Sequence, residues 1–167
     1  MASDAPVLRL RELLGSLADT DLEFLVFGAV AAALYGHVRA TADLDIVIRP
    51  TPENRERMLA WLAAHDARLG NDPNVPFGQR HQRALHLGRN AFVVTEYGQL
   101  DVVQHISGLP GWETLSTRAE RFDLDGLTVL AVDRQTLIDR KRARGLTLDL
   151  ADVEALEALD HQPPPAA

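Results

Sequence analysis

Apolar residues are arranged in two ways along the chain, either at helical spacing or in short apolar segments. Over 7–17 they recur every three or four positions, which predicts an amphipathic helix with Pro6 in its first turn. Two short, largely apolar segments, at 22–28 and 43–49, predict buried strands. Between them, the alanine-rich segment 29–36 predicts a short helix that ends at its glycine. The first third of the chain therefore alternates helix and strand.

The middle of the chain combines one clear helix with shorter apolar segments. Residues 52–65 have helical spacing, and the Thr51 side chain is suited to cap that helix. Residues 68–82 are rich in glycine, proline and asparagine, and they predict a mobile loop. Three further apolar runs predict strands at 84–88, 91–97 and 100–106. The Gly98-Gln99 step predicts a tight hairpin between the last two of these strands.

The last third of the chain predicts the same two kinds of element. They are a short helix within 107–122, a turn at Asp125-Gly126, a strand at 127–132, a helix from the cap Asp133 to Gly145, and a helix at 150–159. Strands that alternate with helices predict an α/β or α+β fold, in which helices flank a mixed β-sheet. We expect one domain over 1–160 and a disordered tail over 161–167.

Composition narrows the class of protein. The chain has 167 residues, 46% of them hydrophobic, which is enough for one domain with a sizeable core. Its net charge of -7 gives no general attraction for a nucleic-acid backbone. The absence of cysteine excludes disulfides, thiolate zinc sites and cysteine nucleophiles. The longest apolar run, 24–36, is shorter than the roughly 20 residues that span a bilayer, so we predict a cytoplasmic protein without a membrane partner.

Two acids interrupt the second predicted strand. Asp43 and Asp45 lie two positions apart, so their side chains point to the same face of the sheet, with Cα atoms about 6.5 Å apart. Asp101 lies inside a later predicted strand, and it is about 5 Å away if the two strands are neighbours. Three converging carboxylates predict a site for Mg²⁺ ions that hold a nucleotide's phosphates. The alternative for any isolated pair of this kind is a strand start with a solvated edge position.

The residues upstream favour the metal site over that alternative. Gly28 and Ala29 place a glycine and a helix start directly after a strand. Backbone N–H groups at such a turn can hold a phosphate. A glycine alone is a weak signal, but the order glycine turn, helix, basic loop, paired acids and third acid is much more specific.

This order of residues resembles the nucleotidyltransferase superfamily with the DNA polymerase β-like core. That superfamily has a glycine and a small residue, two acids that flank one apolar residue, and a third acid on a later strand. Within it, the chain is similar to small bacterial AbiEii-type proteins, some of which are toxins of toxin–antitoxin pairs. This similarity rests on the segment GxxRxTxDxD from Gly36 to Asp45 and on LTVLAV, LIDRKRARG and DLADVEAL. It covers roughly residues 22–160.

The resemblance implies a small mixed β-sheet nucleotidyltransferase core with flanking and C-terminal helices. It implies an enzyme that moves a nucleoside monophosphate from an NTP to an acceptor hydroxyl and releases pyrophosphate, with Mg²⁺ as the metal. Asp43, Asp45 and Asp101 would hold the metal, and Lys141 would reach the triphosphate. The nucleotide-binding residues would be Gly28, Ala29, Arg39 and Thr41.

Each of the less specific residues also has a plainer interpretation. Lys141 could belong to a solvated helix face, because arginines surround it. Arg39 could pair with a surface acid, and Thr41 could bond its own backbone in a turn. Many related chains have glycine or serine where this one has Ala29, and a basic residue where it has Leu148, which leaves the role of Asp149 open.

The acceptor is not readable from the sequence. RNA, a protein and a small molecule such as an antibiotic all stay open, as does an antitoxin partner. A protein of the same fold that binds a nucleotide or a partner without catalysis is the alternative from another functional class.

Overall fold

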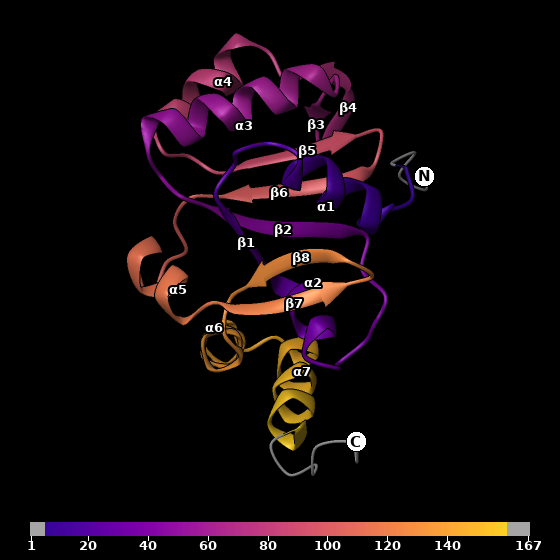
Figure 1. Cartoon of the computed structure of the whole chain (residues 1–167), viewed down its shortest axis with the longest axis vertical. Coiled ribbons are helices and arrows are strands. Elements are labelled where there is room, and N and C mark those ends of the chain that lie inside the picture. The colour runs from indigo at the N-terminus through magenta and orange to yellow at the C-terminus, as the bar shows by residue number, and fades with distance from the viewer. Residues whose placement is uncertain (1–5, 160–167) are drawn as a thin grey trace.

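A computed structural model of the chain describes residues 6–159. The helices of this part are α1 (Leu10–Ala18), α2 (Gly28–Leu34), α3 (Pro52–Ala64), α4 (Gln79–His86), α5 (Trp112–Arg118), α6 (Arg134–Arg144) and α7 (Thr147–Ala158) (Figure 1). The strands are β1 (Phe24–Phe27), β2 (Asp43–Ile48), β3 (Arg68–Leu69), β4 (Asp72–Pro76), β5 (Ala91–Thr95), β6 (Gly98–Val103), β7 (Glu120–Leu124) and β8 (Leu127–Ala131). The tail predicted to be disordered, 161–167, lies outside the described residues.

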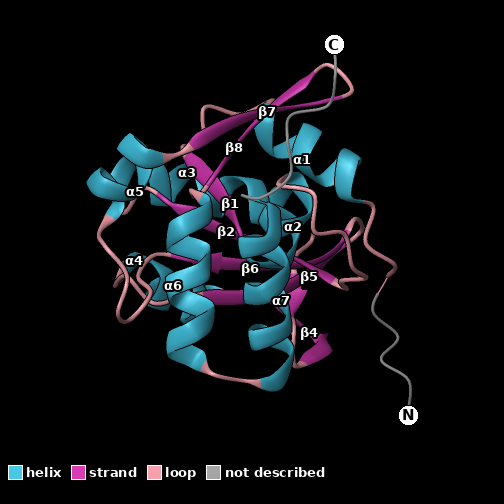
Figure 2. Cartoon of the chain, turned by 90° about the horizontal axis from the view of Figure 1, so that it is seen from below, coloured by secondary structure: helices cyan, strands magenta, loops and turns pink. Residues whose placement is uncertain are grey.

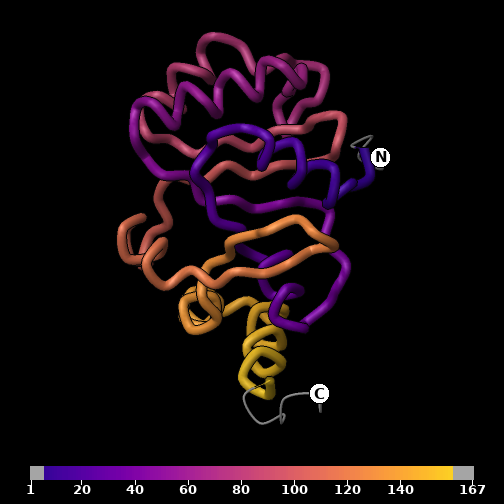
Figure 3. The backbone as a smooth tube through the Cα atoms, viewed as in Figure 1, coloured from indigo at the N-terminus to yellow at the C-terminus, as the bar shows by residue number. Residues whose placement is uncertain are grey.

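All of these strands belong to one mixed sheet. Its order is β4-β3-β5-β6-β2-β1-β8-β7. β2 runs parallel to β6 and β1 parallel to β8, whereas the other neighbours are antiparallel. β1 and β8, about a hundred residues apart in sequence, lie side by side in the backbone trace (Figure 3). The predicted α/β class with a mixed sheet and C-terminal helices is confirmed.

The core lies where α1 and α3 pack on the central strands. In β2 and β6 every second side chain points into it, among them Leu44, Ile46 and Leu100, which are fully buried. The side chains between them point to the other face, near α6 and α7, which lie side by side (Figure 2). The predicted caps of α3 and α6 are confirmed, because Thr51 and Asp133 each accept a backbone hydrogen bond at the helix start. None of the helices in residues 6–159 has the length and apolar character that a bilayer crossing needs.

Two predictions in the middle of the chain are wrong. Residues 68–82, predicted as a loop, form β3, β4 and the start of α4. Residues 84–88, predicted as a strand, contain the end of α4. The apolar pattern there is too short to distinguish the two periods, and only Leu85 is buried while Leu87 is 72% exposed.

The predicted hairpin exists, but its turn lies two residues earlier. Thr95 pairs with Gly98, so Glu96 and Tyr97 form the connection. Gly98 has a φ of 116°, and a Cβ atom on it would lie 2.8 Å from the Cα of Leu8. A glycine is therefore required at this position, but the reason is the close approach of the N-terminal segment and not the turn itself.

Three boundaries also differ from the prediction. The first helix begins at Leu10, so Pro6 is not in its first turn. The segment 107–122 contains the predicted helix α5, but its end belongs to β7, which the pattern did not predict. The last helix begins at Thr147, three residues before the predicted start, and it therefore includes Asp149.

Candidate active site

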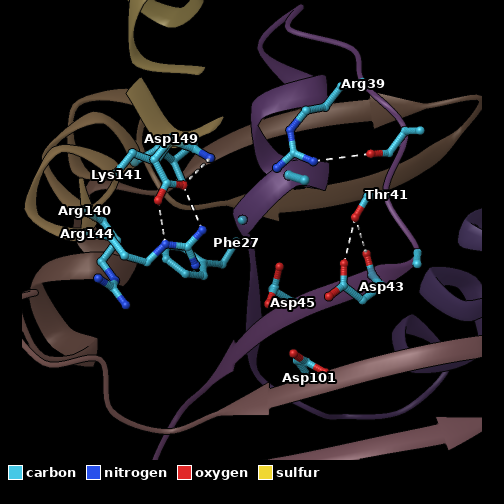
Figure 4. Close-up of a pocket in the computed structure, with 15 residues that line it drawn as sticks. Phe27, Arg39, Thr41, Asp43, Asp45, Asp101, Arg140, Lys141, Arg144 and Asp149 are labelled. Carbon is cyan, nitrogen blue, oxygen red and sulfur yellow. Dashed lines mark hydrogen bonds and ion pairs between the residues drawn. The ribbon is translucent and has the colours of Figure 1, made fainter. Parts of the chain in front are cut away.

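Three carboxylates meet on the face of the sheet that looks toward α6 and α7. β2 and β6 are parallel neighbours in a register that places Asp45 beside Asp101 and Asp43 beside Gln99. One ligand oxygen from each of Asp43, Asp45 and Asp101 lies within 4.8 Å of the others, and all three side chains are half-buried (Figure 4). β2 and β6 are thus adjacent strands, as the metal-site hypothesis required.

The charges of these acids are poorly compensated. Burial, followed by the charges of Asp43 and Asp101, raises the pKa of Asp45 to about 7. Burial also raises the pKa of Asp101, although a hydrogen bond from Gln99 opposes the rise. Carboxylate oxygens are ligands that hard divalent cations prefer, and such a cation would remove the repulsion among them. The donor set therefore fits Mg²⁺.

The turn before α2 approaches these acids closely. Gly28 has a φ of 64°, and a Cβ atom there would lie 2.0 Å from Oδ2 of Asp45. Only glycine therefore fits this position both in conformation and in space. No side chain caps α2, so the first-turn N–H groups beside Gly28 and Ala29 have no side-chain acceptor.

Thr41 fixes one of the acids. Its hydroxyl donates a hydrogen bond of 2.7 Å to Oδ1 of Asp43 and lies 3.3 Å from the backbone oxygen of the same residue. The turn interpretation of Thr41 captured part of this geometry, because the bond is local. Its main partner is nevertheless the Asp43 carboxylate.

Basic residues of α6 form the opposite wall. Leu137, Arg140, Lys141 and Arg144 line the same cavity at helical spacing. Lys141 is only 7% exposed, so the alternative of a solvated helix face is wrong for it. Its Nζ lies 2.5 Å from Oδ2 of Asp152 and 3.9 Å from Oδ1 of Asp149.

Two buried acids of α7 hold this wall in place. Asp152, 1% exposed, accepts hydrogen bonds from His37 at 2.7 Å, Arg39 at 3.2 Å and Lys141 at 2.5 Å. Asp149, also 1% exposed, accepts two from Arg144 at 2.7 and 2.8 Å.

Burial pushes the pKa of both acids upward, but their basic partners outweigh it. For Asp149, Arg144 and then Lys141 bring the pKa below its ordinary value. For Asp152, the hydrogen bonds from Lys141 and His37 and the charges of Lys141 and Arg39 do the same.

All eight residues predicted for the site line one cavity of about 440 Å³. They are Gly28, Ala29, Arg39, Thr41, Asp43, Asp45, Asp101 and Lys141. Sequence reasoning did not place His37, Arg140, Arg144 and Asp152 at or beside this cavity. The spacing 137, 140, 141, 144 and the spacing 149, 152, 153, 156 each mark one helix face, and that signal could have identified all but His37.

The fold is shared with solved nucleotidyltransferases. The lincosamide antibiotic adenylyltransferase LnuA, bound to lincomycin, superposes with a TM-score of 0.62 at 12% identity over 92% of this chain and 99% of that one. ANT(2'')-Ia in complex with adenylyl-2''-tobramycin has a TM-score of 0.55 at 13% identity, over 91% and 92% of the two chains. A putative nucleotidyltransferase from Thermotoga maritima has a TM-score of 0.52 at 13% identity, over 96% and 97%.

These similarities concern the fold alone. No protein-family model matches the chain, and no curated protein matches it in sequence. The chain has the nucleotidyltransferase fold, as the resemblance implied. The AbiEii-type similarity, the toxin role, the antitoxin partner and the cytoplasmic location stay predictions.

Proposed function

We propose that the protein is an enzyme that transfers a nucleoside monophosphate from an NTP to an acceptor hydroxyl. One observation carries this proposal: three poorly compensated carboxylates, Asp43, Asp45 and Asp101, face a wall of cations across a single cavity. A nucleoside triphosphate carries several negative charges, which suit the cations, and it binds in such enzymes as a complex with a divalent metal, which suits the acids. The nucleotidyltransferase fold supports the same conclusion.

Each wall has a separate task in this proposal. Asp43, Asp45 and Asp101 would hold Mg²⁺, which when bound neutralises phosphate charge and orients the triphosphate. The N–H groups beside Gly28 and Ala29 would donate to phosphate oxygens.

The cations of the other wall would balance the remaining phosphate charge. Lys141 and Arg144 are fixed by Asp152 and Asp149. Among the cavity's cations in residues 6–159, only Arg140 has no carboxylate partner, so it is free to contact the triphosphate directly.

The reaction requires one bond to form and one to break. The acceptor oxygen attacks the α-phosphorus, the bond from that phosphorus to the bridging oxygen breaks, and pyrophosphate leaves. Asp101 lines the same cavity and would accept the hydroxyl proton. The basic wall would stabilise the charge that develops on the leaving pyrophosphate.

For the acceptor we propose a small hydroxylated molecule. The solved structures of similar fold include enzymes bound to lincomycin and to adenylylated tobramycin. The net charge of -7 gives no general attraction for RNA.

The experiment is incubation with each α-³²P-labelled NTP and Mg²⁺, together with lincomycin, tobramycin, total bacterial RNA, lysate protein or no acceptor. We expect label on a small molecule and release of pyrophosphate, and neither without Mg²⁺. Label on RNA or protein would replace the proposed acceptor, and growth arrest on expression would then support the toxin role. Mg²⁺-dependent NTP binding without any transfer would instead indicate a non-catalytic nucleotide-binding protein.

A further inference from the structure

A neutral amide side chain lies among the three carboxylates of the sheet. Gln99 is on β6, two positions before Asp101, so both side chains point to the same face. The parallel register of β2 and β6 places Gln99 beside Asp43. The amide is therefore next to two of the three acids whose oxygens could hold a metal ion.

The Gln99 side chain contacts one of these acids directly. Its Nε2 donates a hydrogen bond of 3.3 Å to Oδ1 of Asp101. Both side chains are half-buried, so water competes for this bond less than it would on the surface. The bond engages Oδ1 and leaves Oδ2 of the same carboxylate for a metal ion or for the proton of an acceptor hydroxyl.

A second neutral donor holds the acid at the start of β2. The Thr41 hydroxyl donates its 2.7 Å hydrogen bond to Oδ1 of Asp43 (Figure 4). Asp43 and Asp101 are thus each oriented by an uncharged side chain. The loss of such a partner of a metal ligand typically weakens metal affinity or activity about 10- to 100-fold.

The lack of charge on these donors separates them from the partners of the acids on α7. Asp149 and Asp152 both accept hydrogen bonds from basic side chains. A basic side chain at position 99 would pair with the acids of the sheet and remove the repulsion that a divalent cation would otherwise relieve. An amide orients Asp101 without that competition.

We infer that Gln99 is a positioning residue, which orients the Asp101 carboxylate for the metal ion and the acceptor hydroxyl and leaves the charge of the cluster available to the metal. Gln99 acts through Asp101 and neither gains nor loses a bond in the reaction. This inference rests on the proposed function, because it concerns the metal site of the same reaction.

The first test compares Gln99→Leu with Gln135→Leu. Gln135 is a matched control, because its Nε2 donates to Oδ1 of Asp139 at 2.8 Å on the exposed face of α6. The probe is Mn²⁺, which takes the same carboxylate ligands as Mg²⁺, together with α,β-methylene-ATP, which cannot transfer its nucleotide. Binding is followed by water-proton relaxation. We expect Gln99→Leu to weaken Mn²⁺ binding about tenfold and Gln135→Leu to leave it unchanged.

Turnover and unfolding distinguish positioning from a merely structural role. With α-³²P-ATP at saturating Mg²⁺, Gln99→Leu should lower kcat about tenfold and leave the KM for ATP unchanged, because the basic wall is intact. Its urea midpoint should stay at the wild-type value. A lower urea midpoint with wild-type Mn²⁺ affinity would show that Gln99 is only structural, and this result overturns the inference.

A charged variant tests the same inference in the opposite direction. Gln99→Lys places an ammonium group beside the acids, so in EDTA it should unfold at a higher urea concentration than the wild type and should bind Mn²⁺ more than tenfold more weakly. Gln135→Lys adds the same charge elsewhere and should change neither value. Wild-type Mn²⁺ affinity in Gln99→Lys overturns the inference.

These measurements separate the inference from the proposed function. A wild-type protein that binds neither Mn²⁺ nor the nucleotide refutes the proposed function. A wild-type protein that binds both and transfers label, with Gln99→Leu indistinguishable from it, refutes only the role of Gln99.

Discussion

The two walls of the cavity differ in how far the charges of their acids are compensated within the chain. On the sheet, Asp43, Asp45 and Asp101 repel one another, and the pKa of Asp45 is raised to about 7. On α6 and α7, every buried acid has a basic partner, and the pKa values of Asp149 and Asp152 are lowered. The acids of one wall lack compensation within the chain, whereas the buried acids of the other wall are paired without a ligand.

This difference indicates which wall requires a bound ligand to compensate its charge. An incomplete cluster of half-buried acids costs stability unless a cation arrives, so it is the part of the molecule that points most directly to a ligand. In the proposed function, the cations held by buried acids would already be in position before a nucleotide binds. Preorganised charge of this kind needs no rearrangement when charge develops in a reaction.

The largest effect should come from removing one charge of the incomplete wall. Asp45→Asn should lower nucleotidyl transfer about 10³-fold or more, because it removes a metal ligand and leaves the cavity otherwise intact. The measurement is transfer from α-³²P-labelled NTP, together with the Mg²⁺ dependence of NTP binding.

Asp66→Asn is the matched control. That carboxylate is 84% exposed, and asparagine tolerates the positive φ of 44° at this position. Asp66→Asn should retain activity. Wild-type transfer by Asp45→Asn would show that the cluster does not hold the metal.

The incomplete wall was also the part that the sequence predicted best. A strand alternates its faces, so Asp43 and Asp45 had to share one side. The neighbourhood of β2 and β6 then brought Asp101 to them. These contacts follow from the alternation of side chains along one strand and from one strand pairing. A sequence pattern can predict both.

The completed wall was predicted only in part, because it depends on how two helices and a loop pack together. Lys141 was expected from the resemblance, and its partner Asp152 is only 11 residues away, but the contacts of His37 and Arg39 with Asp152 bridge more than a hundred residues. No local pattern encodes such distances. The strand wrongly predicted at 84–88 has a related cause, since a five-residue apolar run fits either period until its packing is known.

The next largest effect should come from breaking the completed wall. Asp152→Asn leaves the buried Lys141 and the partly exposed Arg39 without their shared carboxylate. Breaking a buried ion pair on one side costs about 3–5 kcal/mol, so unfolding by urea should show a loss near that size. The loosened Lys141 should also raise the KM for NTP about tenfold, while the KM for the acceptor stays unchanged.

Glu157→Gln provides the control for this change. It removes an ion pair with Arg142 between the same two helices, but at exposed positions, where such pairs contribute little. We expect wild-type stability and KM from it. Equal behaviour of Asp152→Asn and Glu157→Gln would mean that the buried acid does not organise the wall.

The smallest effect is the pH dependence of stability without metal, and its sign differs between the walls. The folded protein holds a proton on Asp45 up to about pH 7, whereas an unfolded aspartate loses it near 3.8. Between these values the folded state binds more protons, so stability should fall as pH rises, by at most about 1.4 kcal/mol per pH unit. Asp149 and Asp152 have lowered pKa values, so their contribution is fully present in this window and is lost only as pH falls below the ordinary value.

Urea unfolding in EDTA from pH 4.5 to 7.5 separates the two contributions. Asp45→Asn should flatten the decline and be more stable than wild type at pH 7.5, because it removes the carboxylate that must ionise against burial and two like charges. Asp152→Asn should be less stable throughout but should decline with the wild-type slope. If Asp45→Asn and wild type decline in parallel, the acids on the sheet are already compensated within the chain, and the contrast between the walls is wrong.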